Sequence, residues 1–543
     1  MPTHDVQNQV PPLVGYNLFT SDRALTEGVQ REGAGWIGDT AQRLGRILGG
    51  EQAIAWGADA NSNPPVLHTH DAQGQRIDEV RFHPAWHSLM RLSIEFGLHN
   101  LPWREKRAGG HVARAAIFRM AGENEAGHSC PISMTYAAVP TLRLQAELAA
   151  EWEPRIASTT YDERFAPAGE KSGALLGMAM TEKQGGSDVR ANTTRAVPAG
   201  RGGPGATYLI TGHKWFCSAP MCDAFLVLAQ APGGLSCFLL PRWTAEGVRN
   251  NFFLQRLKNK LGNRSNASSE VEFDAATATL VGEEGRGVRN ILEMVNHTRL
   301  DCTLGGSGMM RQAVVQATHH ARHRSAFGLP LVEQPLMQNV LADLCLESEA
   351  ATVLAMRLAG AYDRTEESEA LFRRIATAVA KYWVCKRATA HVGEALECLG
   401  GNGFVEDSAM PRLFRESPLN SIWEGSGNVI CLDVLRAIGS EPQTMDALLA
   451  EIELGRGRDE RFDRYVTALT SQWKSMAADV RQARRLVERL ALALQGSLVL
   501  RHSPPFVAAA FCASRLATDG GRAFGTLPAD VDCVAIIDRA WAP

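Results

Sequence analysis

The segment TYLITGHKWF at residues 207–216 decides how the rest of the chain is interpreted. Branched and aromatic residues are frequent there, as they are in β-strands. Three further segments, AFLVLAQ, LSCFLLPRW and SEVEF, have the same texture, and Gly, Pro and Asn residues separate them. Short strands at this spacing are typical of a small barrel or sandwich rather than of alternating strand–helix units.

Helical periodicity lies on both sides of this β region. From about Ser21 to Leu148, apolar residues recur three and four positions apart. Three longer segments between about Gly285 and Ile438 predict an antiparallel bundle, and a linker at 439–443 leads to further helices. We therefore predict a multidomain, mainly α fold. Its expected domains are an N-terminal helical domain (1–174), a small central β-barrel (175–283), a four-helix bundle (284–439) and an extra C-terminal helical domain (440–543).

The composition is that of a packed globular protein. Of the 543 residues, 45% are hydrophobic and 21% are charged, which excludes a disordered or fibrous chain. A net charge of −3 argues against a generally basic nucleic-acid coat, although it leaves a local basic patch open. A Rossmann domain would alternate strands with helices and carry GxGxxG at its first strand–helix turn; this chain does neither, so we interpret the β region as an insert that holds a cofactor.

The cysteines and the apolar stretches indicate the compartment. The 11 cysteines are scattered without a CxxC pair, so neither a zinc site nor a disulfide scaffold is expected. The sequence has no run of about 18 apolar residues and no secretory signal pattern. We therefore expect a soluble, cytoplasmic protein that binds no metal.

Two clusters in the β region suit a flat, phosphorylated ligand. Adjacent glycines followed by Ser and Asp in MTEKQGGSD (180–188) form a tight turn whose amides can approach an anion. In GHKWFCS (212–218), adjacent aromatic residues on a strand point to opposite faces, so one of them can stack on a flat ligand. Taken alone, a surface turn and ordinary packing are the commoner explanations of these clusters.

Three clusters in the second helical region have similar alternatives. Arg324 ahead of Phe-Gly suits a diphosphate, or a helix cap and a turn. The glycines of ECLGGNGF (397–404) permit a close approach, or simply end a helix. Glu424 follows Trp423 just ahead of an apolar helix. A carboxylate excluded from water there would have a raised pKa and act as a general base, whereas the alternative is a glutamate in a helix N-cap region.

Together and in this order, the clusters resemble the acyl-CoA dehydrogenase superfamily over roughly residues 112–436. TEKQGGSD is similar to the family's flavin loop, and RSAFG, LGGNGF and WEGSGN match three further family patterns. A closer resemblance, to the AidB branch of alkylation-response flavoproteins, covers almost the whole chain. It rests on FHPAWH, GHKWF, LKNKLGNRSNAS, NSIWEGSGN, CLDVLR and the extra segment after about residue 440.

This resemblance implies an FAD site. Phe216 and Ser218 replace a flavin-stacking tryptophan and a threonine of the family, which keeps a flat ring and a hydroxyl. Arg324, Gln334 and the 400–401 turn would hold the adenosine diphosphate of a neighbouring subunit's FAD, which implies a homotetramer built as a dimer of dimers. The full set of implied cofactor contacts is Met180, Thr181, Gly185, Gly186, Ser187, Phe216, Cys217, Ser218, Arg324, Phe327, Gln334, Gly400, Gly401, Trp423, Gly425, Ser426 and Asn428.

Glu424 aligns with the catalytic carboxylate of the family. Some relatives carry the base on the first long helix of the bundle, but here that neighbourhood reads NHTRLD with Thr298 beside Arg299, so no rival base occupies the position. The resemblance implies that Glu424 removes the α-proton of an acyl thioester while the β-hydride passes to the flavin. A short or branched acyl-CoA and an unidentified electron acceptor would be the partners.

The AidB resemblance also implies double-stranded DNA binding and a role in the response to DNA alkylation, with only weak dehydrogenase turnover. The alternative is a purely metabolic acyl-CoA dehydrogenase. Oxidation of nitroalkanes is a third candidate that position 424 disfavours, because that chemistry prefers an aspartate base. The candidate DNA contacts are Arg436, Arg481, Arg484 and Arg485. Residues 441–543 hold thirteen basic and thirteen acidic residues, so the region is not basic overall.

Overall fold

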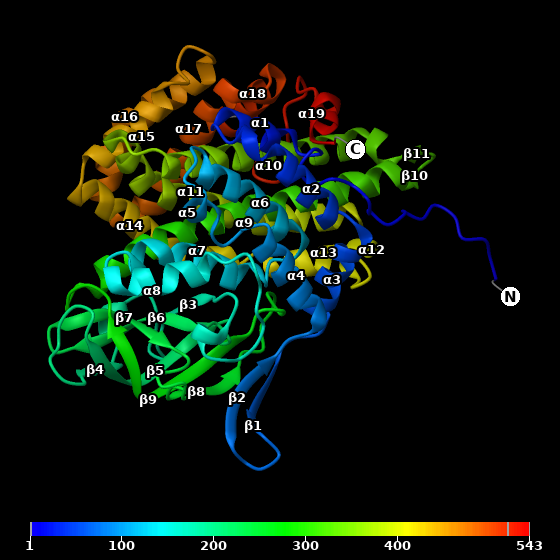
Figure 1. Cartoon of the computed structure of the whole chain (residues 1–543). Coiled ribbons are helices and arrows are strands. Elements are labelled where there is room, and N and C mark those ends of the chain that lie inside the picture. The colour runs from blue at the N-terminus through cyan, green and yellow to red at the C-terminus, as the bar shows by residue number, and fades with distance from the viewer. Residues whose placement is uncertain (1–2, 518–520, 542–543) are drawn as a thin grey trace. The chain divides into compact units, whose positions relative to one another are not determined.

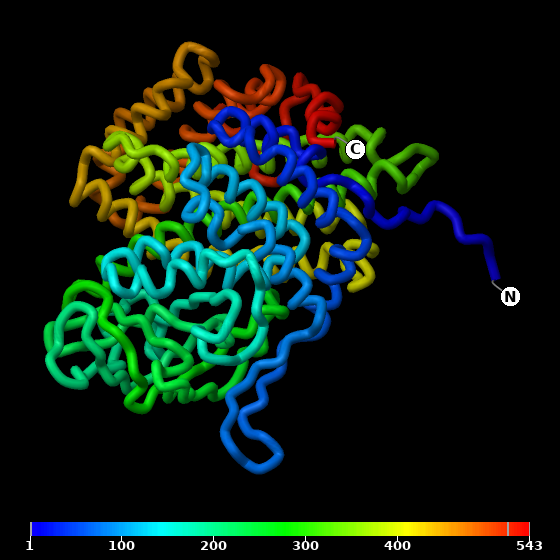
Figure 2. Tube along the Cα trace, in the orientation of Figure 1, coloured from blue at the N-terminus to red at the C-terminus, as the bar shows by residue number. Residues whose placement is uncertain are grey.

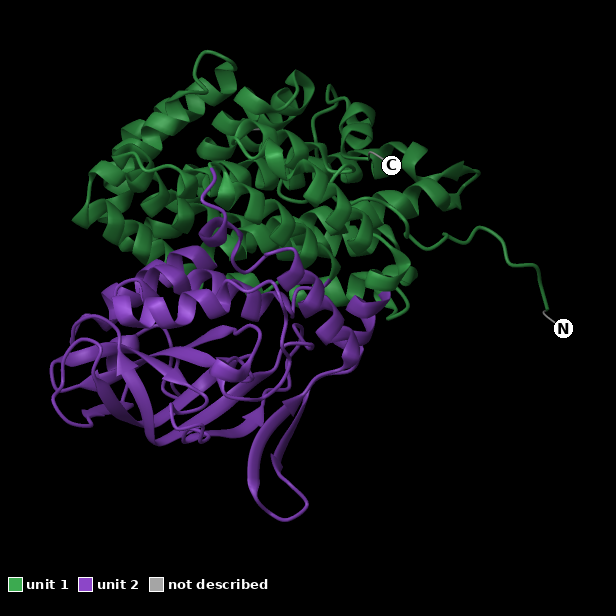
Figure 3. Ribbon diagram, viewed as in Figure 1, with its two compact units in different colours: residues 1–54, 108–124, 299–543 green, residues 55–107, 125–298 purple. Residues whose placement is uncertain are grey.

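In the computed structural model, which describes residues 3–517 and 521–541, the chain divides into two units. Unit 1 contains residues 1–54, 108–124 and 299–543, and unit 2 contains residues 55–107 and 125–298 (Figure 3). The elements of both units are labelled in Figure 1.

Unit 2 is built around the predicted barrel. Seven strands form one sheet in the order β3-β6-β4-β5-β9-β7, with β8 paired to β9. Because β7 pairs with β6 as well as with β9, the sheet closes on itself. The strands are β3 (Leu176–Ala179), β4 (Arg195–Pro198), β5 (Thr207–Ser218), β6 (Ala224–Ala231), β7 (Gly234–Pro241), β8 (Phe252–Leu257) and β9 (Ser268–Leu280). The predicted β region is confirmed.

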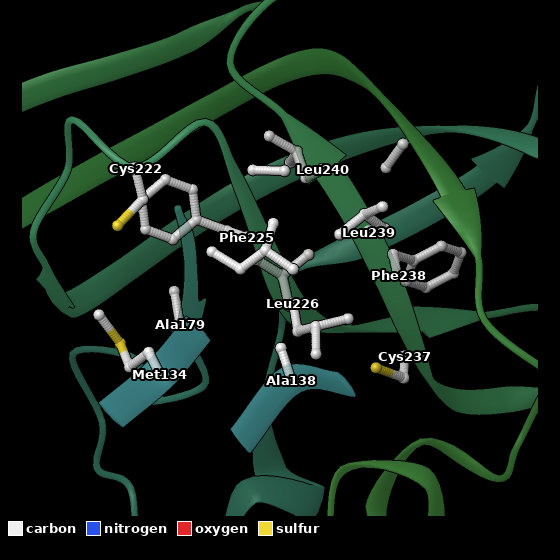
Figure 4. Packing of buried hydrophobic residues seen from close by; sticks show 14 of the residues in the cluster. Met134, Ala138, Ala179, Cys222, Phe225, Leu226, Cys237, Phe238, Leu239 and Leu240 are labelled. Carbon is white, nitrogen blue, oxygen red and sulfur yellow. The ribbon is translucent and has the colours of Figure 1, made fainter. Parts of the chain in front are cut away.

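The barrel interior joins the helical part of unit 2 in one hydrophobic core. Phe225 and Leu226 of β6 and Phe238 of β7 are completely buried. Met134 and Ala138 of α7 (Ser129–Leu142) belong to the same cluster (Figure 4). Non-polar side chains from both strands and helices therefore exclude water from this core. The other helices of unit 2 are α4 (Pro84–Glu95), α5 (Leu101–Arg104) and α8 (Ala146–Ile156).

The helical prediction for residues 21–148 is wrong at one place. Strands β1 (Val66–His70) and β2 (Arg76–Arg81) form an antiparallel hairpin, and Figure 2 shows the chain running out and back along it. The turn contains Gly74 at φ +82°, a conformation that favours glycine. This Gly and the alternating branched and polar residues of VLHTH and RIDEVR are the hairpin pattern that the helical interpretation overlooked.

Unit 1 contains the predicted helical bundle. Helix α9 (Gly287–His323) enters unit 1 at Arg299, and it is followed by α10 (Pro335–Asp363), α11 (Glu367–Cys398) and α14 (Gly427–Ser440). The N-terminal helices of the unit, α1, α2 and α6, pack with these helices or with one another. Their bounds, with those of the short elements, are α1 (Arg23–Arg31), α2 (Gly38–Leu48), α3 (Glu51–Ser62, which crosses into unit 2), α6 (Gly110–Asn124), β10 (Ser325–Ala326), β11 (Leu329–Pro330), α12 (Gly401–Phe404) and α13 (Met410–Glu416).

The C-terminal helices pack against this bundle and belong to the same unit. Helix α15 packs against α11, and α17 packs against α10, α11 and α14. A buried ion-pair cluster joins the two parts, since Arg357 of α10 binds Glu369 of α11 and Glu451 of α15, each at 2.8 Å. The C-terminal helices are α15 (Gln443–Glu453), α16 (Glu460–Ala478), α17 (Ala483–His502), α18 (Pro505–Phe511) and α19 (Cys533–Ala540). No helix in the described part of the chain has the length and apolar character needed to cross a membrane.

Candidate functional site

The predicted flavin loop lies in unit 2, directly after strand β3. Gly185 has φ +135°, and the amide of Gly185 donates to the carbonyl of Glu182 at 3.0 Å, which closes a tight turn. A Cβ atom on Gly186 would lie 2.4 Å from Oγ1 of Thr181, so only glycine fits against this threonine. The turn from Gly185 to Ser187 is exposed, so its main-chain amides are accessible.

A buried ion pair anchors this loop. Nζ of Lys214 on β5 lies 2.8 Å from Oε1 of Glu182, and both side chains are completely buried. Glu182 also accepts hydrogen bonds from the amide of Thr193 at 2.7 Å and from the amide of Thr194 at 3.2 Å. Burial opposes ionisation of the carboxyl, but the Lys214 charge and these hydrogen bonds outweigh it and lower the pKa of Glu182 to about 2. The buried ion pair of Glu182 and Lys214 therefore attaches the loop to strand β5.

Glu182 and Lys214 are not among the site residues predicted from the sequence. The inward positions of β5 alternate, with Tyr208, Ile210 and Lys214 all buried. A lysine at the end of such an apolar alternation predicts a buried cation that needs an anionic partner. This pattern could have identified Lys214, but its partner is 32 residues away and comes from a turn.

Neither Trp215 nor Phe216 is fully buried, so the expected arrangement, with one aromatic ring in the core and the other outside it, is not found. A register irregularity between Lys214 and Cys217 interrupts the pairing of β5 with β9, so strict alternation is lost there. The Phe216 ring is 52% exposed and Trp215 is half-buried. Nζ of Lys258 lies 3.3 Å from the Trp215 ring centre and 4.7 Å from that of Phe216. About half of Phe216 is thus accessible, and the Lys258 ammonium lies over its ring.

The next two residues of β5 differ in accessibility. Cys217 is completely buried, and burial raises the pKa of its thiol to about 12. The main chain of Cys217 is buried as well, and its carbonyl accepts a hydrogen bond from the Ser269 hydroxyl at 2.8 Å, so the predicted cofactor contact of Cys217 has no accessible surface. Ser218 is half-buried, and its hydroxyl lies 3.4 Å from that of Ser268 on β9.

In unit 1, three of the predicted FAD contacts, Arg324, Phe327 and Gln334, lie in or next to the short β10–β11 turn. The guanidinium of Arg324 donates to the main-chain carbonyl of Asn8, and the Asn8 side chain exchanges two hydrogen bonds of 2.8 Å with the main chain of Ser325. Phe327 is 99% exposed at φ +53°. Nε2 of Gln334 donates to the carbonyl of Ala326 at 2.9 Å and so ties the start of α10 to this turn.

The glycine pair after α11 has the geometry of a helix end. Gly400 adopts φ +58° two residues after α11 ends at Cys398. Gly401 begins the short helix α12, and a Cβ atom on either residue would meet nothing within 4 Å. The helix-ending alternative therefore describes the backbone correctly, and the space beside both glycines is open.

Glu424 lies in a turn between two helices of unit 1, immediately before α14. The residue is half-buried and adopts φ +56°, which is uncommon for glutamate. Nε of Arg299 donates to the Glu424 carbonyl at 3.1 Å, and a second guanidinium nitrogen of Arg299 donates to Asp433 at 2.8 Å. The indole N–H of Trp423 donates to Asn420 at 2.8 Å. The turn is therefore bound by a distant side chain, Arg299, and by a local hydrogen bond of Trp423.

The residues after the turn start helix α14. Ser426 occupies the N-cap position, but its side chain makes no capping hydrogen bond. Oδ1 of Asn428 accepts a 2.8 Å hydrogen bond from Nε of Arg484. This contact joins the start of α14 to the C-terminal helix α17.

The four arginines predicted to contact DNA are exposed. The side chain of Arg436 is 71% exposed and lies 3.3 Å from Asp433, and that of Arg481 is 90% exposed and lies 3.0 Å from Asp479. These pairs lower the local positive charge. Arg485 follows Arg484 on the exposed side of α17.

Three family models match successive parts of the chain. The N-terminal domain of the adaptive response protein AidB matches residues 8–163, the middle domain of acyl-CoA dehydrogenases matches 177–276, and their C-terminal domain matches 285–439. Fold and sequence therefore define an acyl-CoA dehydrogenase-type oxidoreductase, a class of flavoproteins that uses FAD.

Similarity to individual relatives shows which branch of this class the chain belongs to. The AidB protein of Escherichia coli (strain K12) is 48% identical over 522 residues, which are 96% of this chain and 95% of that protein. Acyl-CoA dehydrogenase family member 11 of Caenorhabditis elegans is 32% identical over 77% of this chain and 70% of its own length. The crystal structure of the C. elegans protein ACDH-11 in complex with C11-CoA superposes with a TM-score of 0.85 at 26% identity, covering 95% and 94% of the two chains. The chain belongs to the AidB branch of the acyl-CoA dehydrogenase family.

Proposed function

We propose that this protein oxidises the Cα–Cβ bond of an acyl-CoA thioester, with Glu424 as the base. The observation that carries the proposal is the turn that presents Glu424. Glu424 adopts φ +56° in a half-buried turn, and Arg299 binds its main-chain carbonyl, so the backbone that carries the carboxylate is fixed. A carboxylate that takes up a proton at a fixed position is what α-proton removal requires.

The described residues fit a flavin. The half-exposed aromatic ring of Phe216 suits a flat ligand, and the exposed Gly185–Ser187 turn suits a ring edge or phosphate oxygens. When bound, FAD supplies the acceptor for the hydride that leaves Cβ. The chain's own contribution is to bind and orient the thioester and to hold the α-proton on Glu424.

Each unit carries residues that we propose as FAD contacts. In unit 2 they are Met180, Thr181, Gly185, Gly186, Ser187, Phe216 and Ser218, whereas the completely buried Cys217 is left out of the set. In unit 1 they are Phe327, Trp423, Gly425, Ser426 and Asn428, together with Arg324, Gln334, Gly400 and Gly401, which would hold the adenosine diphosphate of a neighbouring subunit's FAD. Arg324 supports this assignment because its planar guanidinium can bind two phosphate oxygens. Its hydrogen bond to the Asn8 carbonyl would fix the direction of that guanidinium.

A homotetramer is the proposed assembly, in the cytoplasm. Support comes from large apolar side chains on the surface of unit 1: Phe327 is 99% exposed, Leu336 85% and Phe404 79%. Exposed apolar side chains mark an interface where they form a contiguous patch, and Phe327 and Leu336 lie only nine residues apart in the chain. Light scattering during gel filtration tests the proposal, and a monomer at micromolar concentration would contradict it.

Anaerobic titration of the FAD-loaded protein tests the dehydrogenase reaction. We propose a short or branched acyl chain, so the substrates are butyryl-CoA and isovaleryl-CoA, with an eleven-carbon acyl-CoA because the C. elegans structure contains C11-CoA. The expected result is loss of flavin absorbance with at least one of them, at a rate that Glu424→Gln lowers by about 10²–10⁴-fold. Glu441→Gln, at an exposed glutamate after α14, is the matched control. Unchanged reduction in Glu424→Gln would refute the role of Glu424.

DNA binding in an alkylation response is the second proposed function. It is supported by the exposure of Arg436, Arg481 and Arg485 and by the similarity to AidB. The expected observation is duplex DNA affinity that falls steeply with salt, as counterion release requires, and that weakens in Arg481→Gln. If the protein does not bind DNA at low salt, the DNA role is refuted. The remaining function would be that of a purely metabolic acyl-CoA dehydrogenase, whose dehydrogenase turnover is expected not to be weak.

A further inference from the structure

A buried lysine binds the main chain on both sides of Glu424. Nζ of Lys381, from the middle of α11, donates to the carbonyl of Trp423 at 2.9 Å and to the carbonyl of Gly425. The residue is only 1% exposed. Both acceptors are main-chain oxygens of the residues adjacent to Glu424.

Burying an ammonium group in this position destabilises the fold unless other groups compensate for its charge. Removing a charged amine from water carries a large desolvation penalty, so buried lysines are rare without compensating partners. Two charge-assisted hydrogen bonds to carbonyl oxygens supply part of that compensation. The role of Lys381 therefore depends on the main-chain groups that it binds.

The partners form a turn in a strained conformation. A non-glycine residue at φ +56° persists only where its surroundings determine the backbone. Here three consecutive carbonyls, of Trp423, Glu424 and Gly425, each accept a hydrogen bond from a buried cationic side chain. Lys381 binds the first and third of these carbonyls, and Arg299 binds the second.

The charges of Lys381 and Glu424 also share one neighbourhood. Burial raises the pKa of the Cys302 thiol well above its ordinary value, and the charges of both Lys381 and Glu424 act on this thiol. Lys381 is therefore close enough to affect the electrostatics around Glu424 as well as its backbone.

We propose that Lys381 is a positioning residue for Glu424: it holds residues 423–425 in the left-handed turn that aims the carboxylate at the substrate. This inference rests on the proposed function of Glu424 but adds a residue that the sequence motifs do not include. Reacting groups must be placed closely, since a displacement of about 1 Å costs on the order of 10²-fold in rate. Lys381 acts through the main chain and does not contact the substrate.

The test replaces Lys381 with methionine, which keeps the length and apolar stem but removes the donors. Lys386→Met is the matched control, because Lys386 is an exposed lysine on the same helix. The first measurement is amide hydrogen exchange, by mass spectrometry, on the protein without FAD. We expect exchange in residues 422–427 to accelerate by about tenfold or more in Lys381→Met, with the peptides of α10 and unit 2 unchanged.

The second measurement is flavin reduction in the loaded protein. We expect the limiting reduction rate to fall by about 10–100-fold, while acyl-CoA affinity stays within about threefold. Lys381→Gln, which keeps one donor group, should recover part of both losses. If Lys381→Met does not fold, Lys381→Gln undergoes the same two measurements against the wild type.

The outcomes separate the inference from the function on which it rests. Exchange and reduction both within twofold of wild type in Lys381→Met would overturn the positioning role, and so would faster exchange spread evenly over unit 1. If no acyl-CoA reduces the wild-type protein, the proposed function fails. Faster exchange confined to residues 422–427 would still support Lys381 as the residue that fixes this turn.

Discussion

Replacing Lys214 with methionine should destabilise unit 2 through one buried charge. The substitution removes the ammonium that lies 2.8 Å from Glu182 and leaves that carboxylate in a site with no exposed side-chain surface. The turn that carries Thr181 and Gly186 is attached to this carboxylate. We therefore expect two consequences, a loss of stability and weaker retention of FAD.

The contacts around Glu182 set the size of the stability loss. Removing one partner of a buried ion pair costs about 3–5 kcal/mol. Glu182 keeps hydrogen bonds from the amide and the hydroxyl of Thr193, at 2.7 and 3.0 Å, so we expect the lower end, about 3 kcal/mol. For a unit of this size, each kcal/mol shifts the Tm by about 2–4 °C, which gives a fall of about 6–12 °C.

Calorimetry of the protein without FAD measures this loss without a contribution from cofactor binding. The control is Lys183→Met, which removes a lysine from the same turn. Lys183 lies 3.8 Å from Glu272, and both side chains are about half exposed, so this pair contributes at most about 1 kcal/mol. Flavin fluorescence on dilution then reports the rate at which each variant releases FAD.

Acid adds an independent measurement. The pKa of Glu182 is about 2 in the folded protein and about 4.5 when the group is unperturbed, so the pair stabilises fully above pH 4.5. That stabilisation is lost as the pH falls from about 4.5 towards 2. The double variant Lys214→Met/Glu182→Gln has no carboxylate at position 182, so its stability should lack this part of the pH dependence. The double variant should also regain stability relative to Lys214→Met. A fall in Tm no larger than that of Lys183→Met would refute the reasoning.

Three further substitutions test other contacts. Gly186→Ala places a Cβ 2.4 Å from Oγ1 of Thr181, so FAD should dissociate about tenfold faster by flavin fluorescence, and unchanged release would contradict the fit argument. Phe216→Ala removes a ring that is 52% exposed; we expect the Tm to change by less than about 2 °C while FAD affinity falls, and a large drop in Tm would show a packing role instead. Asp301→Asn breaks the buried ion pair with Arg114 and should destabilise unit 1 by about 3–5 kcal/mol in calorimetry, whereas a loss below 1 kcal/mol would contradict its importance.

Local patterns were sufficient where one segment determines its own structure. The strand texture at 207–216 and the long apolar periodicities predicted the barrel and the helices α9, α10 and α11, because side-chain period follows directly from backbone geometry. The same approach was wrong at the β1–β2 hairpin, where a short ribbon lies between helices. The motif order was sufficient to identify the family, which the comparisons confirm.

Tertiary structure decided which side chains hold these motifs in place. Glu182 and Lys214 are 32 residues apart, and Lys381 lies 42 and 44 residues from the carbonyls it binds. The irregularity in β5 that turns Phe216 outward depends on its pairing with β9, not on the strand's own sequence. Sequence alone determined the barrel strands, the long helices and the chemical types of the candidate residues. Only folding brought distant charges into contact, because the energy of a buried ion pair depends on distance and desolvation, which no local pattern records.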